Sequence, residues 1–178
     1  MMNLNRTTKH VFTLLIFTAV IIGFIACGDD NSLEELRKNE LAKLNEYMQA
    51  NYPDTKPKRS GLYFIEEVKG TGDTIVPGDQ VQIYYATWLI DGKLIDETNG
   101  YTTGYKFEPF TVNVGSGTSI AGLEEALTYM QKGSVAFLVI NSELAYGQNG
   151  NMQGNPPVPG FTTLLMRVEV YKIYKAGQ

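Results

Sequence analysis

Apolar and polar residues alternate along several short segments, and this alternation constrains the fold more than any other feature of the sequence. It is clear in residues 80–89, 110–114 and 163–174, while 135–140 is an unbroken apolar run. Successive side chains of a strand point to opposite faces, so these segments predict strands with one buried face. Residues 120–130 instead carry apolar side chains three or four apart, as on one face of a helix. Together they predict an α+β fold: a curved antiparallel sheet packed on one short helix.

Turn and loop signals separate these segments. Residues 61–68 read as one more strand, and Asp91-Gly92 predicts a hairpin turn. Gly133 is expected to end the helix. Residues 99–109 and 148–160 are rich in Gly and in Thr or Pro, which indicates two long loops.

The first 26 residues have the form of an export signal. Arg6 and Lys9 precede an apolar run from Val11 to Ala26, which is shorter than the about 20 residues of a membrane-spanning helix. The run ends in Phe24-Ile25-Ala26-Cys27-Gly28, which resembles a bacterial lipoprotein box. The resemblance implies cleavage before Cys27, lipidation of Cys27, and attachment to the bacterial cell envelope, at the periplasmic face or the cell surface. The alternative is an uncleaved anchor with an ordinary cysteine.

The charge and the scarcity of Cys and His exclude several classes of function. One Cys and one His cannot form an internal disulfide or a Cys/His zinc site, so no metal or other cofactor is expected. The single histidine, His10, lies in the predicted signal, which excludes a histidine base in the mature chain. Removal of residues 1–26 lowers Lys plus Arg from 15 to 13 against 19 acidic residues, a net charge of −6. Such a charge argues against a nucleic-acid partner.

Residues 27–59 are predicted to form a lipidated tether and an amphipathic helix. Ser32-Leu33-Glu34-Glu35 has the form of a capping box that starts the helix, and Pro53 and Pro57 follow its end. One apolar stripe runs along it: Leu33, Leu36, Leu41, Leu44, Tyr47 and Met48. We expect this stripe to cover the outer face of the sheet, where alternation places Tyr84, Trp88, Val135, Phe137, Val139 and Leu165. A dimeric coiled coil is the alternative.

Side chains able to carry covalent chemistry are few. Glu124-Glu125 reads as a pair of solvated charges, because neighbouring residues point apart. The glycines of 115–122 predict a structural turn rather than a phosphate loop, since no Lys-Ser/Thr follows. What remains is an aromatic and apolar set with a few polar groups, which suits a ligand that is desolvated and twisted rather than attacked. Its members are Tyr85, Asp96, Phe110, Ile120 and Tyr146.

Three stretches resemble the FKBP-type peptidyl-prolyl isomerases. They read VQIYYATWLIDGKLIDET, PFTVNVGSGTSIAGLEEALTYMQKGS, and ELAYG followed by NPPVPGFTTLLMRVEV. The resemblance implies an FKBP-like domain over residues 60–175, a half-barrel in which a twisted antiparallel sheet of five or six strands wraps one helix. It also implies an enzyme that rotates Xaa-Pro bonds of unfolded or partner polypeptides in an apolar pocket.

Position by position, the resemblance also implies the site. Tyr85, Asp96 and Tyr146 match the residues that act on the substrate. Ile120 matches the residue whose backbone N–H binds a ligand carbonyl. The remaining positions that match the substrate pocket are Ile95, Phe110, Ser119, Leu123, Val158 and Met166.

The sequence departs from the family pattern in the pocket. Leu123 stands where the family usually has Trp, and Ile95 and Met166 stand where aromatic residues are common. A wider, softer pocket predicts weak isomerase activity and poor binding of macrolide inhibitors. The same departures leave open a second function, a non-catalytic chaperone or peptide-binding module in which the loops 99–109 and 148–160 hold a chain without rotating its bonds.

Overall fold

The computed structural model describes residues 29–177. The chain divides into two compact units, residues 1–36 and 37–178. The predicted signal, 1–26, and the predicted lipidation site, Cys27, lie outside the described residues. Within residues 29–177, no helix has both the length and the apolar character needed to cross a bilayer. The boundary predicted at residues 59 and 60 stays a prediction.

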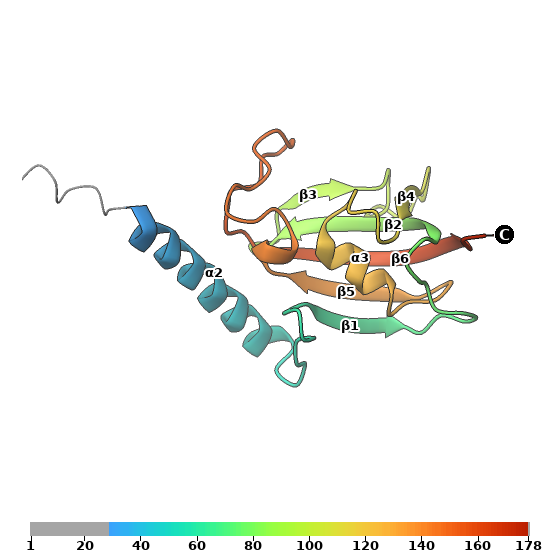
Figure 1. The fold of residues 1–178 in the computed structure, drawn as a ribbon, viewed down its shortest axis with the longest axis horizontal. Helices are drawn as coiled ribbons and strands as arrows, with labels where there is room; N and C mark the ends of the chain where they lie inside the picture. The colour runs from blue at the N-terminus through green and yellow to red at the C-terminus, as the bar shows by residue number, and fades with distance from the viewer. Residues whose placement is uncertain (1–28, 178) are drawn as a thin grey trace, which may run out of the picture. The chain divides into compact units, whose positions relative to one another are not determined.

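Six antiparallel strands form a single sheet in the second unit (Figure 1). They are β1 (Tyr63–Val68), β2 (Gln80–Leu89), β3 (Leu94–Glu97), β4 (Phe110–Asn113), β5 (Val135–Ile140) and β6 (Leu164–Tyr174). Their order is β1-β5-β6-β2-β3, and β4 pairs with β2 beyond the end of β3. The predicted hairpin is confirmed, because Gly92 adopts a left-handed φ of 87° in the turn between β2 and β3.

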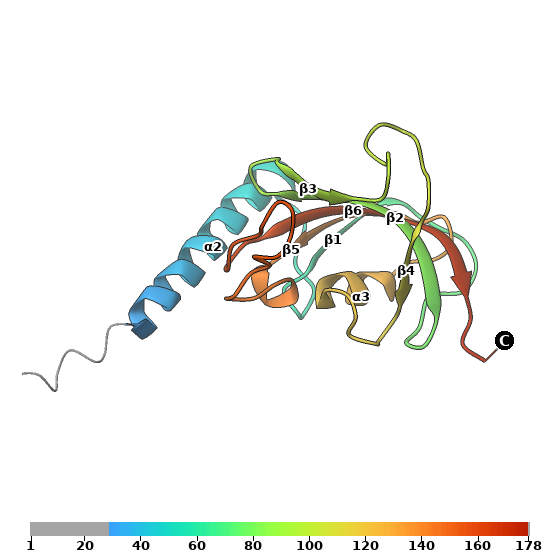
Figure 2. The same ribbon diagram turned by 90° about the horizontal axis from the view of Figure 1, so that it is seen from above.

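The alternation predicted along β2 and β6 is confirmed by burial. Seen from above in Figure 2, the sheet curves over α3 (Ala121–Leu127), which lies on its concave side. The core fills the space between them. Its strand residues include Val81, Ile83, Val112, Leu138, Met166, Val168 and Val170, each at most 3% exposed.

α3 is shorter than the spacing of apolar residues predicted. Leu123, Leu127 and Met130 are buried as expected, but the helix ends at Leu127 with Thr128 as its C-cap. The prediction that Gly133 ends it is wrong. Gly133 lies in the following turn, where its N–H donates to the Val170 carbonyl. Apolar spacing continues past the helix because the turn also packs on the core.

α2 (Asp29–Asn51) begins before the predicted capping box, so Ser32 lies inside the helix rather than at its N-cap. The part of α2 that belongs to the second unit packs on the outer face of the sheet, as predicted. There Leu44 and Met48 are buried against Val139 and Leu165. Leu41, which the predicted stripe included, is 37% exposed. The face that packs on the sheet therefore follows Glu40, Leu44 and Met48, four residues apart.

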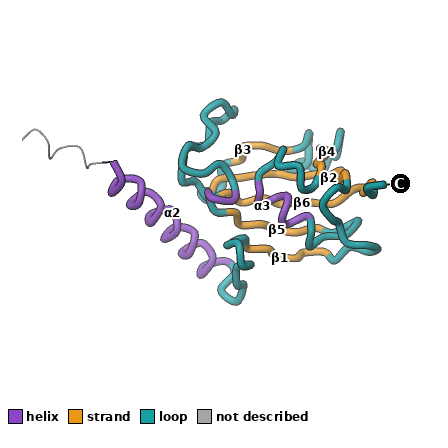
Figure 3. Tube along the Cα trace, viewed as in Figure 1, coloured by secondary structure: helices purple, strands orange, loops and turns teal. Residues whose placement is uncertain are grey.

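The two long loops are visible between the strands in Figure 3. The loop between β3 and β4 folds against the outer face, where Tyr101 packs with Tyr84 and Lys106 pairs with Glu169. The loop between η1 (Ser142–Leu144) and β6 is closed on itself, because Asn151 and Val158 form a backbone bridge. Val158 is 3% exposed and belongs to the core.

Docking of α2 on the sheet predicts a large difference between two leucines of one helix. Leu44→Ala removes a buried side chain and should lower the free energy of unfolding by about 2–5 kcal/mol. Leu41→Ala, at an exposed position of the same helix, should change it by no more than about 0.5 kcal/mol. Denaturant unfolding of both variants measures this, and equal losses would contradict the docking.

Candidate functional site

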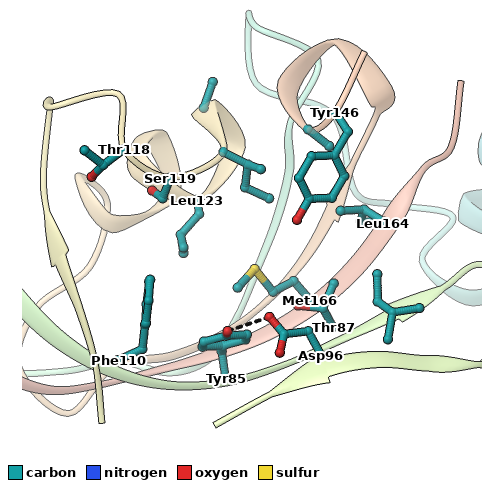
Figure 4. Close-up of a pocket in the computed structure, with 14 residues that line it drawn as sticks. Tyr85, Thr87, Asp96, Phe110, Thr118, Ser119, Leu123, Tyr146, Leu164 and Met166 are labelled. Carbon is teal, nitrogen blue, oxygen red and sulfur yellow. Dashed lines mark hydrogen bonds between the residues drawn. The ribbon is translucent and has the colours of Figure 1, made fainter. Parts of the chain in front are cut away.

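A cavity of about 420 Å³ opens between α3 and the sheet, and Figure 4 shows the side chains that line it. They come from β2, β3, β4, β6, α3 and the turn before it, and the segment after η1. The lining residues are Tyr85, Thr87, Ile95, Asp96, Phe110, Thr118, Ser119, Ile120, Ala121, Leu123, Ala145, Tyr146, Leu164 and Met166. The site residues predicted from sequence are therefore brought together, with the exception of Val158.

Tyr85 and Asp96 form the polar edge of the cavity. Their strands are paired, and the Tyr85 hydroxyl donates a hydrogen bond to Asp96 Oδ2 at 2.6 Å (Figure 4). Burial, then the hydrogen bond to the Asp96 carboxylate, raises the pKa of Tyr85 above its usual value of 10.0. Tyr85 therefore stays protonated at neutral pH and acts as a hydrogen-bond donor rather than a base.

An aromatic wall adjoins this pair. The Phe110 ring stands edge-on to the Tyr85 ring, with centroids 5.7 Å apart and an interplanar angle of 75°. Pairing of β2 with β4 sets this geometry, because Phe110 lies opposite Ile83 in the register. Phe110 remains 44% exposed and so offers a ring face to a bound ligand.

Two residues that line the cavity carry a donor with no hydrogen-bond partner among the described residues. The Tyr146 hydroxyl points into the cavity in Figure 4 and bonds to no residue of the part of the chain described. The Ile120 N–H precedes α3, and no acceptor in residues 29–177 lies within hydrogen-bond range of it. Donors without a partner at a cavity that has aromatic and aliphatic walls can hold the carbonyl groups of an extended peptide.

Leu123 and Met166 form an apolar floor in place of aromatic side chains. Both are 3% exposed and belong to the main core. Sequence reasoning missed five residues that also line the cavity: Thr87, Thr118, Ala121, Ala145 and Leu164. Thr87 and Leu164 lie two residues from a predicted site residue on the same strand, so the period of two could have found them. The other three are direct chain neighbours of predicted site residues.

Val158 does not line this cavity, and its predicted role in substrate binding stays a prediction. It lines a smaller neighbouring cavity of about 210 Å³, together with Asn151, Gly154, Asn155 and Pro156 of the loop before β6. That cavity shares Ile95, Asp96 and Tyr146 with the first. The loop therefore extends the site with a polar chamber, and Val158 anchors the loop to the core.

Glu124 is not the solvated charge that its pattern predicts. It is 9% exposed, and its carboxylate accepts hydrogen bonds from the N–H groups of Gly115, Gly117 and Ser119 at 2.8, 3.3 and 3.2 Å. Burial alone would raise the pKa of Glu124, but these donors outweigh it and hold the pKa below its usual value of 4.5. The turn before Ile120 is thus anchored by a carboxylate of the chain itself, which also occupies the donors that a phosphate would need.

Comparison with known proteins agrees with this geometry. Residues 72–171 match the family model described as FKBP-type peptidyl-prolyl cis-trans isomerase. The chain belongs to the FKBP-type peptidyl-prolyl cis-trans isomerases. The family and the α+β half-barrel fold predicted from the sequence are therefore confirmed.

Two named relatives of this FKBP-type isomerase come from bacteria. FkpA of Buchnera aphidicola is 34% identical over 120 residues, which cover 67% of this chain but only 43% of the relative. The FK506-binding protein of Neisseria meningitidis serogroup B is 30% identical over 115 residues, which are 65% of this chain and 98% of that protein.

Two solved structures share the fold of this isomerase. The isomerase of Pseudomonas syringae superimposes with a TM-score of 0.66 at 26% identity, over 83% of this chain and all of that chain. FkpA of Escherichia coli gives a TM-score of 0.65 at 30% identity, over 98% of this chain and 75% of that chain.

No cluster of three or more His, Cys, Asp or Glu side chains suited to a metal occurs among residues 29–177. An FKBP-type isomerase site of this composition offers a tyrosine donor, a carboxylate that accepts it, and apolar walls. It can grip and desolvate a peptide, and the roles of its individual residues remain predictions.

Anchoring of the turn by Glu124 predicts a pH-dependent stability. The folded-state pKa is depressed, so the stabilisation is fully present above about pH 4.5 and is lost as the pH falls through the folded pKa. Glu124→Gln should cost roughly 1.5–3 kcal/mol of unfolding free energy at pH 7 and much less at pH 2.5. Denaturant unfolding at both pH values measures this.

Glu125→Gln is the matched control for this measurement. Glu125 bonds to Ser60 and Tyr129 at the surface, so its loss should cost less than about 1 kcal/mol. A Glu124→Gln deficit that does not shrink in acid would contradict the anchoring role.

Proposed function

We propose that this isomerase assists the folding of exported polypeptides by rotating their Xaa-Pro bonds, while a lipid on Cys27 tethers it to the bacterial cell envelope. The single observation that supports the catalytic part is the cavity itself: apolar walls, two free donors and a protonated Tyr85. The FkpA and FK506-binding names of its relatives agree with this activity.

Isomerisation requires no covalent chemistry. Resonance holds the amide C–N bond planar behind a barrier of about 18–20 kcal/mol. In Xaa-Pro both isomers are populated, because their energies differ by only about 0.5–1 kcal/mol. Twisting the bond by 90° breaks the resonance and reduces the charge separation of the carbonyl. An apolar wall therefore favours the twisted form over the planar, more dipolar one.

Each part of the cavity has a defined task in this mechanism. Tyr85, Phe110 and Leu123 grip the prolyl ring by apolar contact. The Ile120 N–H and the Tyr146 hydroxyl bind carbonyl groups of the flanking chain, which holds it while the bond turns. Asp96 accepts a hydrogen bond from the Tyr85 hydroxyl and so fixes the orientation of the Tyr85 ring. Lowering the barrier by about 5 kcal/mol would accelerate exchange roughly 10³–10⁴-fold.

The softer floor of the pocket limits this activity. Leu123 and Met166 leave more freedom to a bound prolyl ring than large flat aromatic side chains would. We therefore expect modest catalytic efficiency, with macrolide inhibitors bound poorly for the same reason.

Tyr146→Phe tests the role of the cavity. The variant keeps the ring and loses one hydrogen bond to substrate, so kcat/KM for a proline peptide should fall about three- to tenfold. Xaa-Pro exchange is measured with the full chain in detergent. Tyr105→Phe is the control, since Tyr105 is 65% exposed on a loop and does not line the cavity.

The same experiment separates catalysis from the chaperone alternative. No acceleration by the unmodified chain, together with suppressed aggregation of an unfolded client, would reject the isomerase mechanism and favour a binding module. Acceleration that Tyr146→Phe and Tyr105→Phe reduce equally would reject the role given to Tyr146.

The lipid anchor is tested separately. The apolar run, followed at once by the only cysteine of the chain, supports lipidation of Cys27. The chain expressed in a bacterial host with radioactive palmitate should be labelled, and Cys27→Ala should lose the label. Asn31→Ala, beyond the predicted cleavage site, should keep it. Label that persists in Cys27→Ala would contradict the anchor.

A further inference from the structure

Glu40 of α2 is a buried carboxylate outside the segment that matches the FKBP family model. Only 5% of the residue is exposed. A carboxylate withdrawn from water is costly unless hydrogen bonds replace its hydration. Here four donors do so, and three of them belong to Ser142 and Thr163, more than 100 residues further along the chain.

The contacts use both carboxylate oxygens. Oε1 accepts the Ser142 N–H at 2.6 Å and the Thr163 hydroxyl at 3.1 Å. Oε2 accepts the Ser142 hydroxyl at 2.6 Å and Arg37 Nη1 at 2.9 Å. Arg37 adds an ion pair with Glu143 at 2.7 Å, so one helix holds two successive residues of η1.

Ser142 and Thr163 both stand at the border of the cavity. The Ser142 carbonyl accepts the N–H groups of Ala145 at 2.9 Å and Gly147 at 2.7 Å, the residues on either side of Tyr146. Thr163 directly precedes Leu164, a cavity residue at the start of β6. The backbone of Ser142 is thus bonded to Glu40 through its N–H and to the turn that carries Tyr146 through its carbonyl.

We propose that Glu40 is a positioning residue of the isomerase site: from α2 it fixes the η1 turn, and through that turn it sets the place of the Tyr146 hydroxyl. Residues 37–51 of α2 thereby contribute to substrate binding without touching the substrate. The inference rests on the proposed role of Tyr146 and adds a residue of α2 that supports this role.

Glu40→Gln is the variant that tests this role. Glutamine supplies one acceptor oxygen where the carboxylate supplies two, and it carries no charge. At least one of the four bonds is therefore lost, and the remaining bonds are weaker. With the full chain in detergent, kcat/KM for a proline peptide should fall about three- to tenfold, as expected for loss of one substrate hydrogen bond. The loss should lie mainly in KM. Glu46→Gln, at an exposed position of the same helix, should leave both constants unchanged.

A double variant separates positioning from general destabilisation. If Glu40 acts through the Tyr146 hydroxyl, Glu40→Gln should have no further effect on kcat/KM in the Tyr146→Phe background. Losses that multiply would overturn the proposal. If Tyr146→Phe alone has no effect, the proposed function of Tyr146 fails. If Tyr146→Phe impairs activity and Glu40→Gln does not, only the present inference fails.

Amide hydrogen exchange gives a measurement independent of activity. The N–H groups of Ala145 and Gly147 should exchange faster in Glu40→Gln and at an unchanged rate in Glu46→Gln. Thr163→Val removes a single bond to Oε1 and serves if Glu40→Gln does not fold. It should produce a smaller change of the same kind, and unchanged exchange at both amides would overturn the proposal.

Discussion

The close contact between α3 and the sheet at Gly122 is the constraint on which the site depends. A Cβ atom at this position would lie 2.5 Å from Cγ2 of Ile140, whose side chain is fully buried. Only glycine lets the helix approach so closely. Its neighbours on both sides, Ala121 and Leu123, line the cavity. The contact that seats the helix therefore also sets the distance between Leu123 and the cavity residues of β2 and β6.

Buried carboxylates hold the two turns that border the cavity residues Ile120 and Tyr146. Glu124 accepts three N–H groups of the turn before α3, and Glu40 accepts the N–H and the hydroxyl of Ser142 in η1. Each turn carries one of the free donors, Ile120 or Tyr146. The charged groups that anchor the turns, Glu124 and Glu40, therefore do not line the cavity. Apart from Asp96, the side chains that line it are neutral. This arrangement suits a reaction whose twisted state is less polar than its ground state.

Periodicity predicted the parts of this structure that local packing decides. The bounds of β2 and β5 agree to the residue, because alternation or an unbroken apolar run directly reflects which faces are buried. The roles of Glu40 and Glu124 were not predictable in this way. Their burial depends on N–H donors supplied by turns, and for Glu40 by turns distant in sequence, while locally each reads as an exposed charge on a helix. The place of Val158 in the adjoining cavity was not predictable for a related reason, because a family match gives its order in the loop but not how the loop folds back on the core.

The apolar floor of Leu123 and Met166 and the anchored turns of Ile120 and Tyr146 have complementary effects on a bound peptide. A reaction that makes no covalent bond tolerates Leu123 and Met166 in place of flat rings, provided that the chain on either side of the proline is held. Apolar contacts of this kind are weakly directional, whereas hydrogen bonds to carbonyl groups fix direction. As the floor becomes less specific, a larger share of substrate orientation falls on the Ile120 N–H and the Tyr146 hydroxyl. In the proposed mechanism, anchoring of their turns by Glu124 and Glu40 therefore compensates for the less specific floor.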